Sequence, residues 1–247
     1  MHTARNKGFT LVEMAIVLVI IGIILAGVMK GRDIVRGSQV KQFSQQFAQK
    51  WATVAQTYYD KTGQLLLDGT GNGGVGASTP DGQMDGGLAT SIAIVGGVED
   101  VLDSVGITPC TLIKSKLINP VTVSGLTIPT AHCNSKVDIV QTTVEGEYAG
   151  TQMVQVDLIT LQLGIGGQNL YRNCVLIYNV PCDVAQGLDT AIDGKADGES
   201  GSCVGLDDNT AGTVDTAYTT VGASVSAAPW GDASSRLAQT VCIILDY

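Results

Sequence analysis

The hydrophobic pattern of this chain changes sharply along its first sixty residues. From Phe9 to Met29 the side chains are almost all apolar, and Glu13 carries the one charge among these 21 positions. A helix rises about 1.5 Å per residue, so this run spans about 31 Å, close to the hydrocarbon core of a bilayer. A glutamate inside such a helix costs about 2.5 kcal/mol unless it finds a partner. The pattern therefore predicts a membrane-spanning helix whose acidic residue has a functional role.

The next thirty residues have a different pattern, in which apolar side chains recur at spacings of three and four with polar residues between them. These positions are Val40, Phe43, Phe47, Trp51, Val54, Ala55 and Tyr58. Gly63 is a favourable terminator because glycine adopts the left-handed conformation without strain. We expect one helix from about Phe9 to Thr62, with a transmembrane or filament-core part at residues 9–31 and an amphipathic stalk at residues 32–62.

The sequence pattern of residues 63–247 is typical of a globular head. Asp68–Gly87 is rich in glycine and predicts a mobile loop rather than a phosphate-binding loop, because no lysine and no helix follow it. Short apolar runs predict strands at Val121–Ile128, Met153–Leu163, Cys174–Val180 and Thr240–Asp246, and short helices are expected at Glu99–Val105 and Thr111–Ile118. The predicted fold is α+β, with the long helix packed on an antiparallel sheet.

Charge is distributed unevenly between these parts. The formal net charge is −9, but residues 9–62 carry +3, whereas residues 63–247 carry six basic and 20 acidic side chains, or −14. An acidic head repels phosphate backbones, so we expect no nucleic-acid partner. Three basic residues follow the apolar run on its C-terminal side, namely Lys30, Arg32 and Arg36.

Six cysteines lie outside the apolar run: Cys110, Cys133, Cys174, Cys182, Cys203 and Cys242. An even number in an exported domain indicates up to three disulfides, for which 15 pairings exist. Our working assignment is Cys174–Cys182 and Cys203–Cys242. Zinc is the rival interpretation, but no C-x-x-C pair occurs, and His132 is the one histidine beyond His2.

The junction before the apolar run reverses the order of a secretory signal. A short polar segment with Arg5 and Lys7 comes first, then Gly8, and the apolar run follows the small residue instead of preceding it. The sequence Gly8-Phe9-Thr10-Leu11-Val12-Glu13 closely resembles the start of type IV prepilins and of the pseudopilins of type II secretion. The alternative is an ordinary signal-anchor helix with a chance glutamate.

The resemblance implies a series of properties for this chain. A prepilin peptidase would remove the leader, residues 1–8, by cutting between Gly8 and Phe9, and the new amine of Phe9 would be methylated. Glu13 would pair with the Phe9 amine of a neighbouring subunit in the filament. The head would lie in the periplasm, with one helix in the inner membrane, before an inner-membrane assembly platform adds the subunit to other pilin or pseudopilin subunits.

A second distinctive segment lies at residues 180–205. Pro181 starts a short helix, Val184, Leu188 and Ile192 form its apolar face, and Gly194 ends it. The pattern Leu-Asp-x-x-Ile-Asp-Gly-x-x-Asp-Gly is similar to a segment of many pseudopilins and minor pilins.

Asp189, Asp193 and Asp197 in this segment could supply oxygen ligands to calcium, although their spacing is not that of an EF-hand. The competing interpretation is an acidic helix end whose aspartates stabilise a turn through the backbone. No other cofactor is expected.

The sequence contains no constellation that predicts catalysis. His132 and Cys133 are adjacent, which is a poor geometry for a base and its nucleophile, and Ser202 does not lie in a G-x-S-x-G turn. We therefore expect a non-enzymatic structural subunit of a type IV pilus or a type II secretion pseudopilus. The alternative from another class is a membrane-anchored adhesin or binding module that acts through its acidic head.

Overall fold

The structure, a computed structural model, describes residues 11–74, 79–88, 92–107, 140–206, 218, 220–234 and 238–246. The expected long helix is present in three consecutive parts: α1 (Leu11–Phe43), a π-helical turn η1 (Ser44–Ala48) and α2 (Gln49–Thr62). Gly63 ends it as predicted, in the left-handed conformation with φ 70°, and its N–H donates to the carbonyl of Tyr59 at 2.7 Å. The fold class is α+β, as the sequence predicts.

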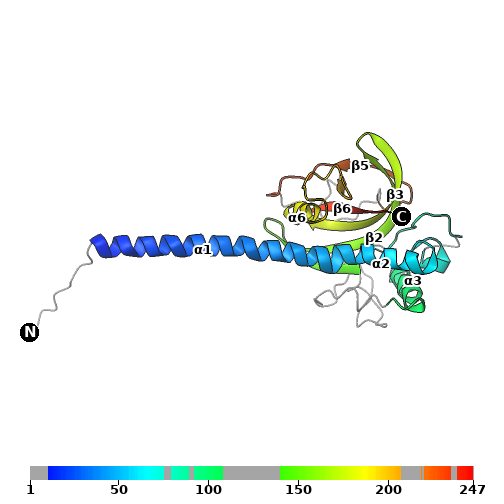
Figure 1. Cartoon of the computed structure of the whole chain (residues 1–247), viewed down its shortest axis with the longest axis horizontal. Helices are drawn as coiled ribbons and strands as arrows, with labels where there is room; N and C mark the ends of the chain where they lie inside the picture. Colours follow the sequence, from blue (N-terminus) through cyan, green and yellow to red (C-terminus); the bar gives the residue numbers. More distant parts are fainter. Residues whose placement is uncertain are drawn as a thin grey trace, which may run out of the picture. The chain divides into compact units, whose positions relative to one another are not determined.

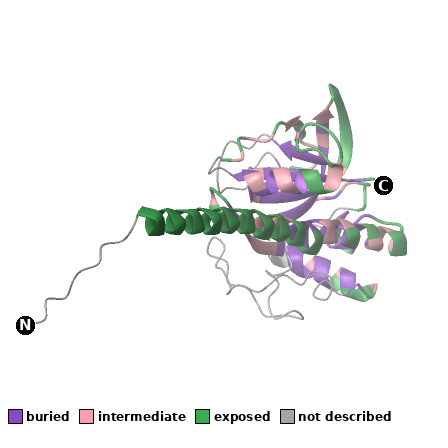
Figure 2. Cartoon of the chain, turned by 60° about the vertical axis from the view of Figure 1, so that its left-hand side comes forward, coloured by how far each residue is buried: buried purple, intermediate pink, exposed green. Residues whose placement is uncertain are grey.

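Contacts divide the chain into two compact units, residues 1–39 and 40–247, so the boundary lies within the segment that the sequence assigns to the amphipathic stalk. In the first unit every described side chain of α1 is exposed or nearly so (Figure 2). In the second unit the predicted apolar face of the helix is buried: Phe43, Phe47, Trp51, Val54, Ala55 and Tyr58.

Six strands form one sheet in the order β1-β2-β3-β6-β4-β5 (Figure 1). Their bounds are β1 (Gln141–Gly146), β2 (Gly150–Ile165), β3 (Gln168–Pro181), β4 (Cys203–Leu206), β5 (Ser224–Ala228) and β6 (Ala238–Leu245). Neighbouring strands in this order are antiparallel. An additional parallel pairing of β5 with β2, at Gln162–Gly164, joins the last strand back to the second. Five strands thus close into a ring.

Each face of the sheet carries its own core, because side chains alternate along a strand. Val156, Val175 and Val241 face the helices α2, α3 (Ile92–Ser104) and α6 (Cys182–Asp193). Leu161, Leu176 and several neighbours on the alternate positions form a second core on the opposite face. The strands therefore read as continuous apolar runs, which is typical of a sheet buried on both sides.

A β-bulge in β3 changes this alternation. The pairing with β6 shifts between Ile177 and Val180, and Asn179 adopts a positive φ of 63°. Before the bulge Ile177 faces the helices and Tyr178 faces the second core, whereas Val180 after it faces the helices again. The extra residue therefore aims the end of β3, and α6 that follows it, at the helical side.

Several predictions about the head need correction. The glycine-rich segment at residues 68–87 is not a free linker where the structure describes it, because it contains a 3₁₀ turn, η2 (Thr70–Asn72), and hydrogen bonds to β2. The helix expected at Glu99–Val105 begins earlier, at Ile92. Strands β1, β4 and β5 were not predicted. The helix at Thr111–Ile118 and the strand at Val121–Ile128 lie outside the described residues.

Candidate functional site

The first candidate site is the apolar surface of α1. Leu11 is 87% exposed and Leu18 is 70% exposed, although contact of a leucine side chain with water is unfavourable. The helix Leu11–Thr62 is long and apolar enough to cross a membrane by length and composition. Covering apolar surface of this extent with lipid or with other protein is favourable by about 25 cal/mol per Å².

Glu13 lies in the first described turn of α1. Gly8 and Phe9, the predicted processing residues, lie outside the described residues. The structure therefore places Glu13 within one turn of the beginning of the described helix, and the cut itself stays a prediction.

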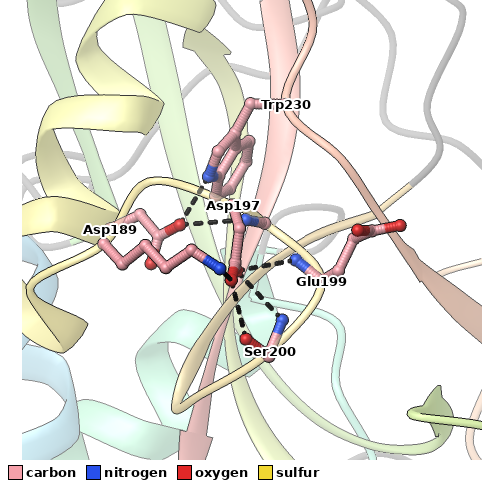
Figure 3. A network of polar contacts seen from close by, with 7 residues as sticks. Asp189, Asp197, Glu199, Ser200 and Trp230 are labelled. Atoms are coloured by element: carbon pink, nitrogen blue, oxygen red, sulfur yellow. Dashed lines mark hydrogen bonds and ion pairs between the residues drawn. The ribbon is translucent and has the colours of Figure 1, made fainter.

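The second candidate site surrounds the C-terminal end of α6. Asp189 is fully buried there. One of its carboxylate oxygens, Oδ2, accepts hydrogen bonds from the indole Nε1 of Trp230 at 2.6 Å and from the backbone N–H of Gly198 at 3.0 Å (Figure 3). Its other oxygen, Oδ1, has no hydrogen-bond partner among the described residues. Burial raises the pKa of Asp189, and the two hydrogen bonds oppose that rise.

Asp193 and Asp197 fasten the loop that follows α6. The carboxylate of Asp193 accepts the backbone N–H groups of Ser202 at 3.1 Å and Cys203 at 2.7 Å, which ties the helix end to the start of β4. Asp197 accepts a hydrogen bond from the hydroxyl of Ser200 at 2.8 Å and pairs with the Lys195 ammonium at 2.7 Å. These contacts are the turn chemistry that the competing interpretation of the acidic segment predicts.

Glycine at position 198 is a steric requirement of this arrangement. Gly198 has φ 72°, and a Cβ there would lie 2.7 Å from the carbonyl oxygen of Ala228. The backbone of the loop therefore approaches β5 more closely than any other residue would permit. This contact explains why glycine stands at position 198.

Calcium binding at Asp189, Asp193 and Asp197 stays a prediction. Within the described part of the chain, no three acidic, histidine or cysteine side chains are grouped in a way that could hold one metal ion. The three carboxylates accept hydrogen bonds from the backbone, from Trp230 and from Ser200 instead, so a cation would have to displace some of these donors.

Other structural aspartates were missed by the sequence analysis. Asp157 is fully buried in β2, and its carboxylate accepts the N–H groups of Gly87, Leu88 and Leu158 at 2.8–3.0 Å. Asp68 accepts the N–H groups of two loop residues, Asp81 and Gly82. The available signal was an acidic residue between Val156 and Leu158 in an apolar run, which indicates a buried acceptor.

Neither cysteine pairing expected from the sequence is present in the structure, in which the four described cysteines are all buried. Cys174 and Cys182 are separated by most of β3, at about 3.3 Å per residue, which is far beyond the Cα separation that a disulfide can bridge. Cys203 and Cys242 lie on neighbouring strands but face opposite sides of the sheet. Cys110 and Cys133 lie outside the described residues.

Comparison with known proteins gives one family match, at the N-terminus. Residues 3–29 match the family model of the prokaryotic N-terminal methylation motif. Neither the search of curated proteins nor the search of solved structures gives a match. The matched residues include Gly8, Phe9 and Glu13 together with most of the apolar helix. This motif is the class III signal of type IV pilins and pseudopilins, so the match identifies that signal at the N-terminus of this chain.

Proposed function

We propose that this chain is a structural subunit of a type IV pilus or of a type II secretion pseudopilus. It is inserted in the inner membrane as a prepilin with its head in the periplasm, and prepilin peptidase cuts it between Gly8 and Phe9. The observation that carries the proposal is the methylation motif joined to a helix whose apolar side chains are exposed along its whole first half. That surface is covered first by lipid and then by the helices of neighbouring subunits.

Assembly in this proposal depends on Glu13. After cleavage, the Phe9 amine of each incoming subunit carries a positive charge into an apolar helical core, where an unpaired charge is costly. The Glu13 carboxylate of a neighbour neutralises that charge, and the pairing also fixes the axial position of the new subunit. No such contact forms if either group is missing, so both cleavage and Glu13 are needed.

Processing is tested by mass spectrometry of the intact protein from cell membranes. The expected mature chain begins at Phe9 and carries one additional methyl group on its amine. A Gly8→Val variant, whose branched side chain hinders cleavage, should keep its leader. A wild-type protein that begins at Met1 would contradict the proposal.

Assembly is tested with Glu13→Val, which removes the carboxylate while keeping an apolar helix. We expect this variant to be processed normally but to enter filaments at least tenfold less than the wild type. Met14→Val, a neighbouring change that leaves the charge intact, is the matched control. Equal incorporation of the Glu13 variant would remove its assembly role.

The same variant separates a filament subunit from the alternative, an anchored adhesin. An adhesin that acts through its head alone would keep its binding to a surface or cargo when Glu13 is replaced. Within the filament proposal, the cysteine-containing head and the segment at residues 180–205 favour a pseudopilin or minor pilin over a major pilin. Subunit abundance in purified filaments distinguishes these two.

A further inference from the structure

We propose that the head carries a binding site for a neutral saccharide, close to the end of the hairpin formed by β2 and β3. The ligand that fits the site is a chain of pyranose rings whose hydroxyl groups are all equatorial, as in a β-linked glucan. This site lies on the surface of the head, so it goes beyond the proposed function and does not depend on processing or assembly. The proposal rests on two adjoining hollows, on an exposed tyrosine and on polar groups available to a ligand.

The first hollow is lined by the loop at residues 82–83, by the exposed part of β3 and by the end of β6. Its volume is about 410 Å³, which is within the range of about 300–1,000 Å³ that is usual for ligand sites. Most of the lining side chains are polar or aromatic: Gln83, Thr160, Tyr171, Arg172, Asn173 and Asp246. Hydroxyl, amide, guanidinium and carboxylate groups are thus present together, and they can donate to and accept from several hydroxyl groups of one ligand.

Tyr171 gives this hollow an aromatic wall. Its side chain is 62% exposed, yet the ring has a defined position, because it lies against Gly222. A Cβ at Gly222 would be 3.4 Å from Cε1 of Tyr171 and 3.7 Å from Oε1 of Gln83. A pyranose ring with equatorial hydroxyl groups has flat faces made of C–H groups, and these faces pack on the negative face of an aromatic ring. An exposed aromatic side chain beside polar groups therefore fits a sugar ring.

The polar groups of the hollow are oriented but still available for hydrogen bonds. The N–H of Met84 donates to the hydroxyl of Thr160 at 2.8 Å, and this hydroxyl donates to Oδ1 of Asn173 at 2.6 Å. These two bonds fix the side-chain amide of Asn173 and leave its NH₂ group as a donor. In the part of the head that the structure describes, neither the guanidinium of Arg172 nor the carboxylate of Asp246 forms an ion pair. The site is thus prepared for a ligand with several hydroxyl groups.

Charge favours a neutral ligand over an anion, which is the rival ligand for a guanidinium. Asp246 lines the hollow together with Arg172 and would repel an anion. The head as a whole is acidic, since residues 63–247 carry six basic and 20 acidic side chains. A guanidinium and a carboxylate can instead each form two hydrogen bonds with adjacent hydroxyl groups, which leaves the net charge of the site unchanged.

A second hollow extends the site beyond one sugar ring. Its volume is about 220 Å³, and it shares Arg172 and Asp246 with the first hollow. Much of its remaining lining is apolar: Leu163, Ile165, Leu170 and Ile244. The C–H face of a neighbouring ring would cover these side chains, and covering apolar surface is favourable. The two hollows together therefore fit an oligosaccharide better than a single sugar.

The test is a titration of the full chain with cellotriose, followed by saturation-transfer NMR. The detergent has no sugar headgroup, because a glucoside detergent would compete for the site. We expect a dissociation constant of about 1 mM, since an open hollow buries only part of the ligand. Sorbitol has hydroxyl groups but no ring face, and the cellotriose analogue with a carboxylate on each ring is an anion, so both should bind at least about tenfold more weakly. No saturable binding of cellotriose, or equal binding of either comparison compound, overturns the proposal.

Matched variants place the ligand on the head. Tyr171→Ala should weaken the binding of cellotriose by about tenfold, whereas Tyr171→Phe keeps the ring face and should lose less. Tyr148 is 46% exposed in the turn between β1 and β2, so Tyr148→Ala is the matched control and should bind like the wild type. Equal binding by Tyr171→Ala and the wild type overturns the site. Glu13→Val should also bind cellotriose normally, so a failure of assembly and a failure of the saccharide site appear in different variants.

Discussion

The first unit of this chain and its head reverse the usual relation between polarity and burial. In α1, leucines, isoleucines and valines are exposed, Leu11 and Leu18 among them. In the head, by contrast, Asp157 and Asp189 are fully buried. Both aspartates accept hydrogen bonds from N–H donors in the head, whereas the apolar residues of α1 have no cover within their own unit. The described part of the head buries a core of its own, whereas α1 exposes its apolar surface.

The largest expected effect comes from equal truncations in the two regions. Ile177 lies in the core of the head and is fully buried, whereas Ile20 in α1 is 51% exposed. Ile177→Ala should lower the free energy of unfolding of the head by about 2–5 kcal/mol, because it removes buried methyl groups and leaves a cavity. Ile20→Ala should leave it unchanged. Both are measured by denaturant unfolding in detergent, and equal losses would mean that α1 is part of the cooperative fold.

The next effect concerns a buried aspartate. Asp157→Ala leaves the N–H groups of Gly87, Leu88 and Leu158 without their acceptor, so we expect a loss of about 3 kcal/mol. Asp157→Asn keeps one acceptor oxygen and should lose less than half as much. Hydrogen exchange at Gly87 and Leu88 should rise in the alanine variant. Unchanged exchange would show that another group anchors this loop.

The pH dependence of Asp189 gives a smaller effect. Its pKa is raised in the folded state, so the stability associated with its protonated form is present below the unfolded pKa and is lost as pH rises through the folded pKa. Asp189→Asn keeps an oxygen for Trp230 and Gly198 without the charge. At pH 7 the free energy of unfolding of this variant should be within about 1 kcal/mol of the wild-type value. Between pH 4 and pH 7 the variant should become more stable relative to the wild type, because only the wild type loses stability as Asp189 ionises.

Asp232 provides the control of opposite sign for this pH series. Hydrogen bonds from Ser234 lower the pKa of Asp232, so its contribution is present above the unfolded pKa and is lost as pH falls through the folded pKa. The free energy of unfolding of Asp232→Asn should therefore be lower than the wild-type value at neutral pH and equal to it at acidic pH. If both variants showed the same pH trend, the burial of Asp189 would not be the cause of its shift.

Calcium should have the smallest effect. The carboxylates of Asp189, Asp193 and Asp197 already accept hydrogen bonds, so a cation competes with these donors and should bind with millimolar affinity at best. At a concentration equal to its dissociation constant it would add about 0.4 kcal/mol of stability. Thermal unfolding with calcium, with magnesium and with a chelator measures this. A larger rise, specific for calcium and absent in Asp193→Asn, would show a rearranged site.

The sequence predicted correctly those elements whose formation depends on residues close together in the chain. The long helix, its buried face around Trp51 and the stop at Gly63 follow from periodicity and from glycine's left-handed conformation. The same is true of α6, which begins after Pro181 and ends before Gly194.

The missed features depend on residues far apart in the sequence. β5 has only small residues and serine around Val225, and it is a strand because it pairs with β4 and with Leu163 of β2. The face to which Cys203 points is set by the register of β4 against β6, which no local pattern contains. Trp230 could not be assigned to Asp189 for the same reason, since 41 residues separate them.

The ring formed by β2, β3, β6, β4 and β5 has a consequence for the proposed role as a filament subunit, in which many heads would lie close together. A strand with unpaired backbone groups is a template on which a second molecule can add its own strand. Among the described strands only β1 has a single neighbour, since β5 is paired on both sides. In the proposed filament, the described part of each head could therefore add a strand from a neighbouring head only at β1. Closure of the ring in this way removes the other described strands as templates for pairing between heads.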